Sequence, residues 1–94
     1  MYKTIIEILP DNIMPPSNGE QRILVPFLAA YELHIVMLYV APLFQPPSEY
    51  KVEPPYILWK GEPFIEASDT VILYVDYFYK KIIMIFYFKN RRRY

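Results

Sequence analysis

The last fifteen residues hold the strongest concentration of positive charge in the chain. Residues 80–94 contain six of the ten basic residues and none of the ten acidic ones, although the net charge of the whole chain is zero. The six bases are Lys80, Lys81, Lys89, Arg91, Arg92 and Arg93. Guanidinium groups bind phosphate through paired hydrogen bonds, and an aromatic ring such as Tyr94 can stack on a nucleobase. This segment, with its basic tail at residues 90–94, therefore indicates a polyanion-binding site, with nucleic acid as a partner. Alternatively, the same charges keep neighbouring apolar strands from aggregating.

Few side chains could carry acid–base or metal chemistry. His34 is the single histidine, and it lies in an apolar run, which is more typical of a packed residue than of a ligand or a base. Glu62, Glu66 and Asp69 lie close together in the sequence, but solvated loop carboxylates have the same spacing. The chain has no cysteine, two glycines and no nucleophile motif. We therefore expect a non-enzymatic protein without a metal site or cofactor.

Aromatic residues are the main indication of a protein interface. Tyrosine and tryptophan contribute a large contact area with few rotatable bonds, and interfaces favour them for this reason. The candidate interface residues are Tyr50, Tyr56, Trp59, Tyr74 and Tyr87. Ordinary packing in a small core is the alternative role for these rings. Because the apolar content is as high as 54%, we expect contact with another protein, or a homodimer formed at a free strand edge.

Two stretches near the C-terminus predict long strands. Val71–Phe78 and Ile82–Phe88 consist almost wholly of β-branched, aromatic and large aliphatic residues, which suit a pleated surface. We expect them to form a hairpin that turns at Lys80 and Lys81 and that occupies the centre of the sheet. One face of the first strand is apolar and contains Leu73, Val75 and Tyr77. The opposite face is mixed and contains Ile72, Tyr74, Asp76 and Phe78. This mixed face is apolar enough to need a cover of its own.

Three further strands are predicted, at residues 2–9, 33–40 and 56–60, with a helix that begins near Pro26 and ends before Pro42 as the alternative for the second. The stretch between residues 13 and 21 contains Pro15-Pro16-Ser17-Asn18-Gly19 and predicts a loop. Residues 26–32 are compatible with a short helix, because Pro26 suits a first helical turn. Residues 42–55 contain five prolines and predict an extended connection outside the core.

Length and composition limit the fold class. Ninety-four residues make one domain, spanning residues 1–94. The longest apolar stretch, residues 23–44, contains Glu32, His34 and two prolines, which argues against a membrane helix. We predict a mainly β domain with a small antiparallel sheet built around the C-terminal hairpin, or an α+β domain if residues 26–32 are helical. An intracellular location is the expectation.

In overall composition the chain resembles the small orphan proteins of viruses that infect hyperthermophilic archaea. It is rich in isoleucine, tyrosine and proline, lacks cysteine and ends in a basic tail. The resemblance concerns residue usage and no aligned motif, so it carries over no functional residue. It implies a protein that acts inside a hot-living host cell by binding host or viral macromolecules.

Overall fold

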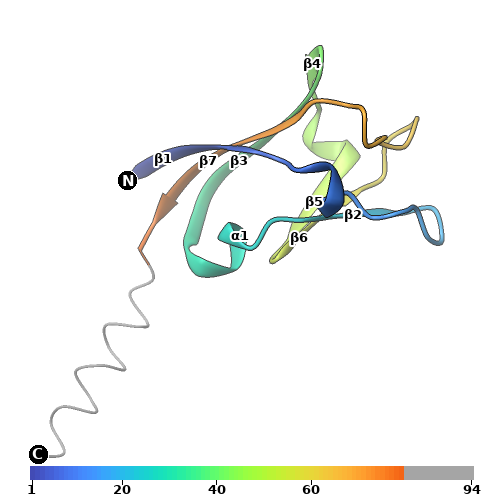
Figure 1. Ribbon diagram of the computed structural model, residues 1–94. Helices are drawn as coiled ribbons and strands as arrows, with labels where there is room; N and C mark the ends of the chain where they lie inside the picture. The colour runs from blue at the N-terminus through green and yellow to red at the C-terminus, as the bar shows by residue number, and fades with distance from the viewer. Residues whose placement is uncertain (80–94) are drawn as a thin grey trace, which may run out of the picture.

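The computed structural model describes residues 1–79 as a mainly β structure (Figure 1). Its elements, in chain order, are β1 (Tyr2–Glu7), the 3₁₀ helix η1 (Pro10–Asn12), β2 (Gln21–Leu24), α1 (Phe27–Ala30), β3 (Glu32–Val40), β4 (Leu43–Phe44), the 3₁₀ helix η2 (Pro47–Glu49), β5 (Tyr50–Glu53), β6 (Tyr56–Trp59) and β7 (Val71–Phe78). The mainly β prediction is confirmed, and the region around residues 26–32 contributes only a single helical turn. The predicted strand at residues 82–88 and the basic tail lie outside the described residues.

The strands form two antiparallel sheets where one was predicted. The first sheet has the order β1-β7-β3-β4, and the second has the order β2-β6-β5. β7 lies at the centre of the first sheet, as predicted, but both of its edges are occupied by β1 and β3. Leu73, for example, lies opposite Ile6 of β1 and opposite Leu38 of β3. Within residues 1–79, β7 therefore pairs with strands from the N-terminal half, and its predicted hairpin partner lies outside the described residues.

The core lies between the two sheets. Along β7, Val71, Leu73 and Val75 are buried, whereas Ile72 and Tyr74 are only half-buried. The alternation follows the strand period of two and confirms the predicted inward face. The buried cluster also contains residues from β2, α1, β3, β6 and the loops, namely Ile8, Ile23, Val25, Leu28, Leu38, Ile57, Trp59 and Ile65.

β3 contains an irregularity that directs both Leu33 and Val36 inward. Leu33 lies opposite Tyr77 and Ile35 lies opposite Asp76, so His34 is an extra residue in the ladder. A bulge of this kind reverses the alternation of side chains along a strand. As a result Leu33 and Val36 both pack against the core, while His34 and Ile35 are exposed.

The proline-rich stretch at residues 42–55 is more structured than predicted. The prediction of a connection outside the core is wrong, because Tyr50–Glu53 forms β5 and pairs with β6. These four residues lie between two proline pairs and contain no proline themselves, so their backbone can form a ladder. Tyr50 and Val52 pack against the core.

The predicted loop at residues 13–21 is the turn of an irregular hairpin. Asn18 and Gly19 have φ angles of 53° and 76°, and Ser17 and Glu20 exchange backbone hydrogen bonds of 2.8 and 3.1 Å around them. Two successive residues with positive φ are typical of the tight turn that suits the twist of paired strands. The Met14 amide extends the hairpin by donating to the Arg22 carbonyl (2.9 Å).

Candidate functional site

The outer face of the four-stranded sheet, which points away from the second sheet, contains several exposed apolar side chains, among them Ile5, Met37 and Phe44. Strand register arranges its side chains in three rows across the sheet. The first row is Lys3, Asp76 and Ile35. The middle row is Ile5, Tyr74 and Met37. The third row is Glu7, Ile72, Tyr39 and Phe44.

The middle row contains no charge. Ile5 is 65% exposed and Met37 is 46% exposed, on either side of the half-buried Tyr74. Phe44 is 55% exposed and extends the row, because its ring centroid lies 5.3 Å from that of Tyr74 and 5.2 Å from that of Tyr39. These distances are typical of favourable aromatic pairs. The result is a connected apolar strip that crosses from β1 to β4.

The outer face of the second sheet has a different character. Lys51 and Glu53 form an ion pair on β5 (3.1 Å). The Arg22 guanidinium on β2 lies 5.5 Å from the ring centroid of Tyr56, which is within reach of a cation–π interaction. Charged groups and their partners therefore lie on this sheet, and within residues 1–79 it is the four-stranded sheet that leaves an apolar face uncovered.

The predicted interface residues do not gather on one surface. Tyr74 lies on the outer face of the four-stranded sheet, and Tyr56 lies beneath Arg22 on the other sheet. Trp59 is a core residue with 4% of its surface exposed, and its Nε1 donates to the Pro63 carbonyl (3.3 Å). The half-buried Tyr50 donates its hydroxyl to the Val36 carbonyl (3.2 Å). Tyr87 lies outside the described residues.

Four tyrosines and Phe27 gather at the end of the sheet where β7 ends. Tyr77 is at their centre, with ring centroids 4.8 Å from Tyr31, 5.7 Å from Tyr2 and 6.5 Å from Tyr79. Burial raises the pKa of the Tyr77 phenol above its ordinary value of 10.0, and charge on Tyr79, Tyr31 and Tyr2 raises it further. Neighbouring rings pack against each other here, which indicates an aromatic cluster and not an open cage.

The residues that could carry acid–base chemistry lie apart. His34 lines an open groove of about 530 Å³ beside Tyr50, and its ring lies edge-on to Phe78 at 5.8 Å. Glu62 and Asp69 line a different pocket of about 220 Å³. Asp69 Oδ2 accepts a hydrogen bond from the Glu66 amide (2.8 Å), so this carboxylate stabilises the turn between residues 66 and 69. Within residues 1–79, no three His, Asp or Glu side chains are placed to hold a metal ion.

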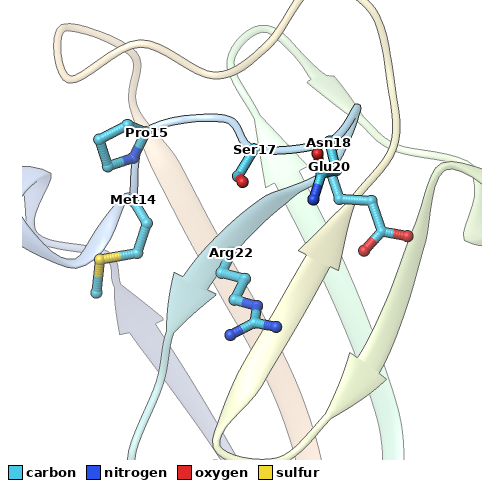
Figure 2. A pocket seen from close by; sticks show the side chains of 6 residues that line it. All are labelled: Met14, Pro15, Ser17, Asn18, Glu20 and Arg22. Atoms are coloured by element: carbon cyan, nitrogen blue, oxygen red, sulfur yellow. The ribbon is translucent and has the colours of Figure 1, made fainter.

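A pocket of about 290 Å³ lies beside the hairpin of residues 13–22. Figure 2 shows the Arg22 side chain between Met14 on one side and Glu20 on the other. Glu20 is already paired with Lys60 (3.7 Å), and Arg22 lies over Tyr56. The lining includes the Ser17 hydroxyl but no histidine that could act as its base, so the pocket lacks the pair that nucleophilic catalysis needs.

Sequence reasoning identified Tyr74 and the mixed face of β7, but it did not single out Ile5, Met37 or Phe44. Ile5 lies between Lys3 and Glu7 in an alternating strand, so its place on the more polar side of β1 was a usable signal.

The six basic residues of the predicted polyanion site lie outside the described residues. No helix within residues 1–79 has the length and hydropathy required to cross a membrane. Comparison with protein-family models, curated proteins and solved structures finds no significant match to this chain.

Proposed function

We propose that this chain is a non-enzymatic binding protein that acts through contact with another protein. Its contact surface is the outer face of the four-stranded sheet. The observation that carries the proposal is the uncharged middle row, in which Ile5 and Met37 are 65% and 46% exposed on either side of Tyr74.

The arrangement of the three rows matches the anatomy of a protein interface. Interfaces place apolar and aromatic side chains at the centre and polar groups at the rim. Here Lys3 and Asp76 border the middle row on one side, and Glu7 borders it on the other. The matching partner surface has an apolar centre, basic groups facing Asp76 and Glu7, and an acidic group facing Lys3.

The test compares two substitutions of the same kind on the folded chain. Met37→Lys places a charge in the middle row. Leu43→Lys makes the same change at a residue that is 66% exposed but lies outside the three rows. Partners are captured on each variant from an extract of the source cell, identified by quantitative mass spectrometry, purified and titrated against each variant. Thermal unfolding confirms that both variants fold.

We expect a partner that binds the unmodified chain and the Leu43→Lys variant, and that loses about tenfold or more in affinity with Met37→Lys. A buried charge without a counter-charge at the centre of an interface has a cost of this size. A partner that binds all three forms equally would exclude the outer face as the contact surface.

A second candidate function is nucleic-acid binding through Lys80, Lys81, Lys89 and Arg91 to Arg93. The separation of these charges from the acidic remainder of the chain supports it. So does the position of Tyr79, which is 58% exposed and directly precedes Lys80. Fluorescence anisotropy with single-stranded DNA and RNA tests this function. Binding that falls steeply with salt, and that is lost when the six bases are replaced by glutamine, would establish it. Absence of binding at low salt would remove it.

A further inference from the structure

We infer that β1 pairs edge to edge with β1 of a second copy of this chain. The two four-stranded sheets would then form one continuous antiparallel sheet. β1 is the edge strand of its sheet, with β7 as its only neighbour among the described residues. Figure 1 shows β1 along the margin of this sheet.

The backbone of β1 offers hydrogen-bonding groups to the open edge. The Ile8 amide donates to the Val71 carbonyl of β7 (2.9 Å). Successive residues of an antiparallel strand direct their amides and carbonyls to opposite sides. The amides and carbonyls of Thr4 and Ile6 therefore point to β7. Those of Lys3, Ile5 and Glu7 point to the open edge. An edge of this kind is a template for another strand.

The side chains of residues 1–9 match a second copy in one antiparallel register. With Ile5 opposite Ile5 of the second copy, Lys3 lies opposite Glu7, and Met1 lies opposite Leu9. Met1, Ile5 and Leu9 are 61%, 65% and 63% exposed, and Lys3 and Glu7 are exposed as well. Each apolar residue thus meets an apolar residue, and each charge meets an opposite charge.

The neighbouring registers lack this match. A shift of two residues places Ile5 opposite either Lys3 or Glu7, and it leaves both of these charges facing apolar side chains. A shift of one residue pairs edge-facing backbone groups with groups that already face β7. Because the favoured register places residues 3, 5 and 7 opposite one another, it uses every free backbone group of these three residues.

Pairing in this register brings the outer faces of both copies to the same side of the joined sheet, because directly opposed residues share a face. The two middle rows then continue one another through the Ile5 pair. This consequence for binding rests on the proposed function, whereas the dimer itself does not. A partner that contacts both faces would gain affinity from divalency.

Charge reversal tests the register directly. In a dimer of the Glu7→Lys variant, a lysine of one copy lies opposite a lysine of the other at both ends of the paired β1 strands. In a dimer of the Lys3→Glu variant, glutamates lie opposite each other there. We expect the unmodified chain to form a dimer and each variant alone to dissociate about tenfold or more readily. In an equimolar mixture of the two variants, one arrangement avoids like charges at both ends. This arrangement is the heterodimer, which joins one chain of each variant.

Both ends of that heterodimer pair opposite charges. At one end the introduced lysine of the Glu7→Lys chain faces the introduced glutamate of the Lys3→Glu chain, which are opposite charges. At the other end the unchanged Lys3 of the first chain faces the unchanged Glu7 of the second, which are opposite as well. We therefore expect the mixture to regain the mass of a dimer. Size-exclusion chromatography with light scattering measures each mass.

Lys3→Glu also places two acids opposite each other within the chain, because Lys3 pairs with Asp76. If circular dichroism shows that this variant unfolds, Lys3→Glu/Asp76→Lys replaces it and keeps opposite charges within the sheet. A monomeric unmodified chain would overturn the inference. So would single variants that dimerise as well as the unmodified chain, or a mixture that does not associate.

The dimer and the partner contact are separable. Met37→Lys leaves β1 unchanged, so we expect it to dimerise normally even where it loses the partner. Glu7→Lys is expected to lose the dimer while each chain keeps the uncharged middle row of Ile5, Tyr74 and Met37, although Glu7 itself borders that row. A dimer that Met37→Lys abolishes and Glu7→Lys preserves would instead place the second copy on the outer face, and would contradict pairing through β1.

Discussion

Gln21 and Ile65 are joined by two hydrogen bonds that pair a side-chain amide with the backbone N–H and C=O of a residue 44 positions away. Gln21 Nε2 donates to the Ile65 carbonyl (2.7 Å), and the Ile65 amide donates to Gln21 Oε1 (2.8 Å). Nε2 also donates to the Met14 carbonyl (3.1 Å). Gln21 is 2% exposed and Ile65 is 5% exposed. The Gln21 side-chain amide therefore bonds to Ile65 as the backbone of a neighbouring strand would. These bonds hold the loop after β6 against β2.

Replacing Gln21 with leucine is expected to lower the free energy of unfolding by about 2–4 kcal/mol, because the buried amide and carbonyl of Ile65 lose their partner. Chemical denaturation measures the change. Gln45→Leu is the matched control, since its side-chain amide donates to the nearby Leu43 carbonyl (3.2 Å) in a solvent-exposed hydrogen bond. We expect a change within about 0.5 kcal/mol there. Equal effects at both positions would show that the Gln21 hydrogen bonds do not stabilise the fold.

Gly61→Ala is expected to destabilise the fold by about 1–3 kcal/mol, because overpacking forces neighbours out of place. A methyl group on Gly61 would lie 2.6 Å from Cη2 and 2.7 Å from Cε2 of the Trp59 ring. Since Trp59 is the single tryptophan, its fluorescence spectrum should shift together with the loss of stability.

Gly19→Ala is the control for this substitution. At Gly19 an added methyl group meets no atom within 4 Å, but φ is +76°. Its cost of about 1–2 kcal/mol comes from backbone strain, so it should leave Trp59 fluorescence unchanged. A spectral shift in Gly19→Ala, or an unchanged spectrum in Gly61→Ala, would contradict the packing of Gly61 beneath the ring.

The tyrosine cluster is expected to make stability fall at alkaline pH. Because the pKa of Tyr77 is raised by burial and by its tyrosine neighbours, the unfolded chain loses this proton at a lower pH than the folded one. Below the ordinary pKa of 10.0 both states keep the proton, and stability does not vary with pH through this group. As pH rises through about 10, ionisation favours the unfolded state until the folded pKa is also passed.

Tyr77→Phe removes the ionisable group while keeping the ring. We expect the alkaline loss of stability to become smaller in this variant, as measured by denaturation at pH values from neutral to about 11. Tyr39→Phe is the control, because Tyr39 lies on the outer face, apart from the cluster. An identical pH profile for Tyr77→Phe and the unmodified chain would show that Tyr77 does not carry the effect.

Local sequence is sufficient to locate several strands and to orient one of them. Val71–Phe78, Glu32–Val40 and Tyr56–Trp59 are rich in β-branched and aromatic residues, and they form strands as predicted. The two faces of β7 are predictable as well, because its side chains must alternate. Alternation alone assigns Tyr74 to the outward face. The Asn18-Gly19 pair is a hairpin signal, although the loop prediction for residues 13–21 does not include the pairing on either side of it.

The sequence by itself thus determined the positions of β1, β3, β6 and β7, the faces of β7 and the separation of charge along the chain. Only the tertiary structure decided that β7 lies between β1 and β3, that Trp59 is buried, and that Ile5, Tyr74 and Met37 form one row. Those features depend on which distant strands pair and in which register. Where nearly every residue of a strand is apolar, many pairings look equally favourable locally, and the choice among them depends on packing of the whole core.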